Sequence, residues 1–242
     1  MKEIVLKCEN LYKKIGKKDI LKGISLEVKK GEIVGFIGPN GAGKTTTIKL
    51  ILGLQKITKG NSYINGYSIT EDFVKAIENV GAIVESPDLY MYLSGYDNLK
   101  LAQNCYKNIT NDRIEEVVKI VGLENRIHDK VSKYSLGMKQ RLGIAQAILH
   151  KPNLLILDEP TNGLDPEGII EIRNLLKHLS HNENIGILIS SHNLSELENI
   201  CDKVYITKNG EIIEETNIDS LKKEEITLEE AFLKKIGGNK ID

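Results

Sequence analysis

The chain has 242 residues, with 33 Lys or Arg against 34 Asp or Glu, so its formal net charge is −1 and gives no general attraction to nucleic acid. Its three cysteines are odd in number and far apart, which disfavours a disulfide framework and suits a reducing cytosol. We expect no signal peptide, and no apolar run approaches the ~20 residues that cross a bilayer, so a partner would have to hold the protein at a membrane.

The amino-terminal part predicts β-structure that leads into a buried strand and a helix. Apolar runs at 4–6 and 24–28, separated by Lys-rich turns, predict an antiparallel β-layer. The continuous apolar character of 32–37 predicts a buried parallel strand. Residues 44–52 carry apolar side chains at helical spacing, and Gly53 is well placed to end that helix.

Residues 38–46 (Gly-Pro-Asn-Gly-Ala-Gly-Lys-Thr-Thr) follow the predicted strand at 32–37 and run into the predicted helix at 44–52. They form a complete Walker A phosphate-binding loop. Its glycines let successive backbone N–H groups point at phosphate oxygens, and the helix N-terminus adds a partial positive charge. Lys44 can reach the β- and γ-phosphates, and the Thr45 hydroxyl can ligate Mg²⁺. A chance Gly-rich turn is disfavoured by the strand–loop–helix order, so the chain is predicted to bind a nucleoside triphosphate. The predicted binding residues of the loop are Gly38, Pro39, Asn40, Gly41, Ala42, Gly43, Lys44, Thr45 and Thr46.

The middle of the chain changes to a helical pattern from about residue 86 to 150. Residues 113–121 and 135–149 each place apolar side chains on one helical face. A second fully apolar strand follows at 154–157, and Asp165 before Pro166 predicts a helix N-cap with proline at the first helical position.

The carboxyl-terminal third adds a strand at 185–190, a short helix at 194–201 and a hairpin around 209–210. These elements predict one α/β domain over 1–242. Its parts would be a nucleotide-binding core, an inserted helical subdomain and a short helical tail. The predicted boundaries are 1–85 and 151–215 for the core, about 86–150 for the helical subdomain and about 216–242 for the tail.

Two carboxylates end the apolar strand at 154–157, and ligands of parallel sheets bind at that end. Asp158 can hold Mg²⁺ directly or through water. Glu159 lies one residue further toward the γ-phosphate, where a carboxylate can orient and deprotonate the attacking water. A strand ending in Asp-Glu is weak by itself, but together with the loop at 38–46 it predicts a Walker B motif.

Five motifs in this order make the chain resemble the ATPase subunit of an ABC (ATP-binding cassette) transporter over nearly its whole length. Beside the two Walker motifs, the family signature is resembled by residues 134–141 (Tyr-Ser-Leu-Gly-Met-Lys-Gln-Arg). The D-loop is resembled by residues 162–165 (Asn-Gly-Leu-Asp), and the segment with the switch histidine by residues 190–192 (Ser-Ser-His). The resemblance implies a P-loop NTPase fold of ABC-cassette type, with a mixed sheet core, an antiparallel β-layer and an inserted helical subdomain.

The resemblance also implies a shared site, because two cassettes of this family close head-to-tail around two ATP molecules. Ser135 and the backbone N–H of Gly137 would face the γ-phosphate held by a second ATPase protomer, with Asp165 of the D-loop at the same interface. His192 would contact that phosphate and steady Glu159, so Lys44, Glu159 and His192 form the expected catalytic set. The simpler interpretations are a plain N-cap at Ser135 and a surface histidine at 192; the first is compatible with anion binding, and the apolar strand before His192 disfavours the second.

Four residues at three motifs depart from the family pattern. The signature has Leu136 and Met138 where Gly and Gln are usual. Glu85 takes the Q-loop position, where a carboxylate keeps an oxygen for Mg²⁺ but loses the amide donor; we expect it to remain a metal-site and relay residue. Ile15 replaces the aromatic residue that stacks on adenine, with Tyr12 nearby, so the preference for ATP over GTP is less secure.

Glu85 combined with the signature at 134–141 and the tail motif at 227–233 resembles the bacitracin and lantibiotic type of ABC ATPase, which exports or expels antimicrobial peptides. This implies ATP, Mg²⁺, membrane permease subunits as partners and no nucleic acid. It also implies a cytoplasmic protein held peripherally on the inner face of the cell membrane. The aromatic-rich segment 87–93 is expected at the groove that receives a permease helix, although packing inside the helical subdomain explains it equally well.

Three alternatives to transport of such peptides remain open. A non-transport ABC ATPase acting on DNA or ribosomes would be expected to carry a long coiled coil, tandem cassettes or a basic patch, and none is visible. The ATPase of a nutrient importer would be expected to have Gln at position 85. A degenerate regulatory nucleotide binder is disfavoured by intact Lys44, Asp158, Glu159 and His192, while the altered signature keeps it open.

Overall fold

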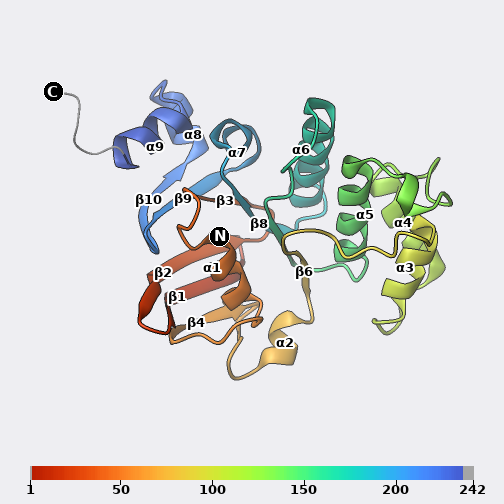
Figure 1. The fold of residues 1–242 in the computed structure, drawn as a ribbon, viewed down its shortest axis with the longest axis horizontal. Helices are drawn as coiled ribbons and strands as arrows, with labels where there is room; N and C mark the ends of the chain where they lie inside the picture. Colours follow the sequence, from red (N-terminus) through yellow and green to blue (C-terminus); the bar gives the residue numbers. More distant parts are fainter. Residues whose placement is uncertain (1, 237–242) are drawn as a thin grey trace.

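Two β-sheets organise the chain in the computed structural model, which describes residues 2–236. The antiparallel sheet contains β1 (Ile4–Ile15), β2 (Lys18–Lys29), β4 (Lys59–Ile64) and β5 (Tyr67–Ser68). The mixed sheet contains β3 (Ile33–Ile37), β6 (Val80–Ile83), β7 (Leu154–Asp158), β8 (Gly186–Ser191), β9 (Lys203–Lys208) and β10 (Glu211–Asn217). Their spatial orders are β2-β1-β4-β5 and β10-β9-β3-β8-β7-β6 (Figure 1).

The strands β3, β7 and β8 are parallel and buried along their whole length. Strands covered on both faces need apolar side chains at every position, which is why these three read as unbroken apolar runs. Since they run the same way, their carboxyl ends meet at one edge of the mixed sheet. That edge therefore receives the segments that follow residues 37, 158 and 191.

The helices lie around the mixed sheet. In chain order they are α1 (Lys44–Ile51), α2 (Phe73–Ile77), α3 (Gly95–Gln103), α4 (Asn111–Ile120), a 3₁₀ turn (Val131–Lys133), α5 (Leu136–Ile148), α6 (Pro166–His181), α7 (Leu194–Ile200), α8 (Ile218–Lys223) and α9 (Leu228–Ile236). In Figure 1, α3, α4 and α5 gather at one end of the molecule, while α1 lies beside the antiparallel sheet.

Alternate residues of the buried strands face two different apolar clusters. Val34 and Phe36 pack with α1 and the antiparallel sheet, whereas Ile33 and Ile37 pack toward the helices on the other face. The period of two in β3 follows from the alternating direction of strand side chains. The mixed sheet is thus the middle layer, and its burial on both faces holds its carboxyl edge in place.

Most elements expected from the sequence are confirmed, including the end of α1, where Gly53 adopts a left-handed φ of 67°. The β9–β10 hairpin turns through Asn209 and Gly210, both at positive φ, as a tight two-residue turn requires. The second strand of this hairpin, β10, pairs with β9 as far as Asn217. Because β10 lies at the edge of the sheet and its side chains are exposed or half-buried, its sequence lacks the apolar alternation that marks a strand.

Within the described residues, no helix is long and apolar enough to cross a bilayer. The region from about 86 starts with a loop, and its first helix begins only at Gly95. The division into core, helical subdomain and tail remains a prediction, and residues 237–242 of the expected tail lie outside the described residues.

Candidate active site

The loop between β3 and α1 curves around the side chain of Lys44. Gly43 has a φ of 102°, and a Cβ at Gly38 would lie 2.4 Å from the carbonyl oxygen of Thr207, so both positions require glycine. Lys44 is only 7% exposed, and its Nζ donates to the Gly38 carbonyl oxygen at 2.8 Å. The loop therefore holds a cation on its inner side. The other predicted loop residues follow the same curve into the first turn of α1: Pro39, Asn40, Gly41, Ala42, Thr45 and Thr46.

Ser190 of β8 holds both acidic residues at the end of β7, Asp158 through its carboxylate and Glu159 through its backbone N–H. Its hydroxyl donates to Asp158 Oδ1 at 2.5 Å and accepts from the Glu159 N–H at 3.0 Å. The Glu159 N–H also bonds the Ser190 carbonyl at 3.1 Å. Glu159 has a φ of 52°, a left-handed conformation that is uncommon for a residue other than glycine. Ser190 is thus a positioning residue that the sequence presented only as part of the switch motif.

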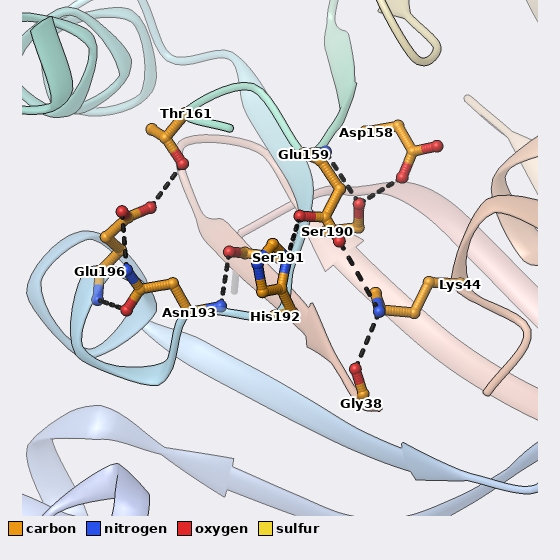
Figure 2. A network of polar contacts seen from close by, with 10 residues as sticks. All are labelled: Gly38, Lys44, Asp158, Glu159, Thr161, Ser190, Ser191, His192, Asn193 and Glu196. Carbon is orange, nitrogen blue, oxygen red and sulfur yellow. Dashed lines mark hydrogen bonds and ion pairs between the residues drawn. The ribbon is translucent and has the colours of Figure 1, made fainter. Parts of the chain in front are cut away.

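The Glu159 carboxylate lies between a lysine and a histidine (Figure 2). Its Oε2 accepts from His192 Nδ1 at 2.5 Å, and its Oε1 is 3.7 Å from Lys44 Nζ. The Glu159 side chain is 23% exposed, so water can reach it. The structure therefore brings the expected catalytic residues Lys44, Glu159 and His192 together from three different segments.

The signature residues lie elsewhere on the same chain. Ser135 caps α5, and its Oγ accepts from the Met138 N–H at 3.2 Å, with Gly137 in the first turn. Asp165 caps α6 by accepting from the Gly168 N–H at 3.1 Å. Figure 1 places the helical end that carries α5 well away from α1. The hydrogen bond and ion pair described for Lys44 go to Gly38 and Glu159, and none joins it to Ser135 among the residues the structure describes.

Leu136, the first unusual residue of the signature, is half exposed and faces the D-loop. A Cβ on Gly163 would lie 3.3 Å from its Cδ2, so the glycine leaves room for the leucine. The bulkier signature residue is thus matched by a small residue opposite it. The sequence showed the unusual Leu136 but not that Gly163 lies beside it.

Glu85 pairs with Lys49 of α1. The hydrogen bond and ion pair described for it do not involve Thr45 or Asp158, the other two expected Mg²⁺ ligands. The Glu85 Oε1 lies 2.8 Å from Nζ of Lys49, and the hydrogen bond and charge of that lysine lower the pKa of the Glu85 carboxyl. The Glu85 side chain is 68% exposed, and exposed ion pairs are weak enough to exchange partners. Ile15, expected near the base, is the last residue of β1 and is 54% exposed.

The residues at this edge fit a magnesium–nucleotide substrate. The backbone N–H groups of the loop and the Lys44 cation suit the phosphate oxygens. Asp158 is 2% exposed, and a buried carboxylate is stable when a cation balances it. One hydroxyl from Thr45 and one carboxylate from Asp158, completed by phosphate oxygens, form the kind of set that Mg²⁺ takes.

Comparison with known proteins gives consistent results. Residues 21–162 match the family described as ABC transporter. The chain is 52% identical to the uncharacterized ABC transporter ATP-binding protein YhcH of Bacillus subtilis, covering 88% of this chain and 70% of that protein. It is 45% identical to the bacitracin transport ATP-binding protein BcrA of Enterococcus faecalis, covering 91% and 72%. It is 41% identical to the lantibiotic transport ATP-binding protein SrtF of Streptococcus pyogenes, covering 94% and 96%.

Solved structures show the same fold. An ATP-binding subunit of an ABC transporter superposes with a TM-score of 0.83 at 31% identity, covering 96% of this chain and 99% of that chain. The cassette MJ0796, solved as a dimer in a post-hydrolysis state with ADP and phosphate, gives a TM-score of 0.77 at 27% identity, covering 88% and 98%.

Proposed function

The chain belongs to the ABC transporter family, and from this premise we propose that it drives the export of an antimicrobial peptide, or immunity to one, of the bacitracin or lantibiotic type. The family places it among ATP-hydrolysing, ATP-binding subunits. Similarity to the bacitracin and lantibiotic transport proteins over at least 90% of this chain supports the peptide class. Glu85 in the Q-loop position agrees with the same group.

The chemistry of hydrolysis rests on the arrangement around Glu159. Its carboxylate, reachable by water, orients a water molecule toward the γ-phosphate and accepts its proton. Lys44 and the loop N–H groups hold the phosphates, while His192 fixes the carboxylate through Nδ1. Thr45, Asp158 and, after it leaves Lys49, Glu85 would hold Mg²⁺, and the ion would neutralise phosphate charge there. The products are ADP and phosphate.

A second copy of the chain completes the site in this proposal. Ser135 and Gly137 sit at the start of α5, where backbone N–H groups and the helix dipole favour an anion. Since they lie away from Lys44 within one copy, they are free to meet the phosphate bound by another. The dimeric form of the MJ0796 cassette supports this arrangement.

A membrane permease is the proposed partner, and a groove beside β6 is the proposed docking place. The groove has a volume of about 1270 Å³, and apolar Leu54 and Val74 in its wall are 63% and 74% exposed. Outside the lining of this groove, segment 87–93 carries exposed Tyr90 and Tyr92, whose rings meet edge to face. Exposed apolar and aromatic side chains around a groove suit an amphipathic helix.

The segment 87–93 has side chains that suit docking of a permease helix and others that suit packing inside the helical region. Leu89 and Tyr96 pack against the apolar cluster of the helices, while Tyr90, Met91 and Tyr92 remain exposed. Docking through these exposed residues would hold the chain on the inner face of the cell membrane.

The partner is tested by pull-down of the tagged chain, wild type and Glu159→Gln, from native membranes with Mg-ATP. Co-purification of a polytopic membrane protein is the expected result, and its identity would narrow the substrate. Recovery of ribosomes or DNA, or of no partner by a folded, ATP-binding chain, would instead favour a non-transport ABC ATPase.

Replacing Glu85 by Ala should lower ATP turnover by about 10- to 100-fold, because a residue that supports the metal is lost. Turnover and transport are measured together as Mg²⁺ is varied, and the variant should need more Mg²⁺. Glu71→Ala removes an exposed carboxylate before α2 and serves as the control. Unchanged hydrolysis and unchanged transport in Glu85→Ala would refute the role given to Glu85.

A further inference from the structure

Two loops flank the catalytic carboxylate, and one side chain of α7 bonds to both. The loop after β7 contains Thr161, and the loop after β8 contains Asn193. Glu196 accepts from Thr161 Oγ1 through Oε2 at 2.5 Å and from Asn193 Nδ2 through Oε1 at 2.8 Å (Figure 2). Its carboxylate therefore bridges segments that are about thirty residues apart in the chain.

The same contacts fix the backbone next to His192. Asn193 caps α7 by accepting from the Glu196 N–H at 3.3 Å, and its own N–H donates to Ser191 Oγ at 3.0 Å. His192 thus lies between two residues that are both held by hydrogen bonds. Its ring projects from this fixed point to the Glu159 carboxylate (Figure 2).

A helix cap alone does not account for Glu196. Asn193 caps the helix through its own side chain, so the cap is complete without Thr161. Thr161 is only 8% exposed and comes from the loop that begins at Glu159 and leads to the D-loop. Its hydroxyl, buried beside Glu196, ties the two loops together.

We propose that Glu196 is a positioning residue for hydrolysis. It holds the loop after β7 and the loop after β8 at the spacing that lets His192 bond Glu159. The inference rests on the roles proposed above for Glu159 and His192. Glu196 itself touches neither of these two side chains, so it acts through Thr161 and Asn193. Because the D-loop is expected at the interface between two copies, the bridge would also connect that interface to the catalytic histidine.

Glu196→Ala in the full chain should lower kcat by about 10- to 100-fold, the range expected when a catalytic group is misplaced by about 1 Å. The KM for ATP should change little, since Glu196 does not contact the phosphate loop. Glu196→Gln can still accept from Thr161 and should recover part of the loss. Thr161→Val is nearly isosteric, so it tests the same bridge even where Glu196→Ala folds poorly.

An experiment in the Glu159→Gln variant separates a role of Glu196 in positioning the catalytic residues from a role in the stability of the fold. In Glu159→Gln, where the proposed base is absent, Glu196→Ala should cause little further loss in single-turnover hydrolysis. Glu198→Ala is the matched control, because Glu198 lies on the same helix and contacts the Leu228 N–H of the tail; its kcat should be unchanged.

The proposal is overturned if Thr161→Val and Glu196→Ala both keep kcat within about twofold of wild type. It is also overturned if Glu196→Ala loses the same factor with and without Glu159. Failure of the proposed base would look different, since Glu159→Gln alone would then turn over normally.

Discussion

Replacing Glu159 by Gln should lower ATP turnover by about 10²- to 10⁴-fold while nucleotide binding persists, because only the general base is removed. Gln has nearly the size of Glu, and the backbone bonds to Ser190 that hold position 159 do not involve its side chain. The amide can still meet His192. The change therefore removes proton acceptance and leaves the local structure intact.

The measurement is steady-state ATPase activity together with thermal unfolding in Mg-ATP. Ligand at a hundred times its dissociation constant should stabilise wild type and variant alike, by about 2.7 kcal/mol. Glu115→Gln, which changes an exposed carboxylate on α4, should retain full activity. Near-normal turnover in Glu159→Gln would mean that another group is the base.

Lys44→Ala should remove both tight nucleotide binding and hydrolysis, with kcat falling by at least about 10²- to 10³-fold. Lys44 is the buried cation inside the phosphate loop, and its loss leaves the Gly38 carbonyl without that donor and the phosphate charge unbalanced. Stabilisation by Mg-ATP should therefore largely disappear, which distinguishes this variant from Glu159→Gln.

Binding is followed by titration with a fluorescent ATP analogue and by thermal unfolding. Lys17→Ala, in the exposed turn between β1 and β2, is the matched loss of a lysine and should behave like wild type. Wild-type affinity and turnover in Lys44→Ala would contradict the placement of the phosphates in this loop.

The parts of the site that use local chain geometry could be predicted from the sequence. A strand, a glycine-rich turn and a helix start suffice to place Lys44, and an apolar strand ending in two acids suffices to place Asp158 and Glu159. Each of these depends on residues within about ten positions of one another. The central strands β3, β7 and β8 could also be predicted, because a strand that is buried on both faces requires a continuous apolar run.

Pairings between distant segments could not be predicted in this way. The contacts of Glu196 with Thr161, Lys49 with Glu85 and Leu136 with Gly163 join positions that no local pattern connects. A single sequence carries no signal for which hydroxyl meets which carboxylate across a fold. The length of β10 was missed for a related reason, since an edge strand with half-exposed side chains lacks a clear alternation.

The most direct test of the account is to mix two inactive variants. Lys44→Ala spoils the phosphate loop, and Ser135→Asp keeps a residue able to cap α5 while placing a negative charge where the γ-phosphate is expected. Each variant alone should be inactive. Mixed in equal amounts, they should regain about a quarter of wild-type ATPase activity, since random pairing of two-fold dimers leaves that share of sites intact. A mixture as inactive as its components, or full activity of Ser135→Asp alone, would contradict a site shared between two copies.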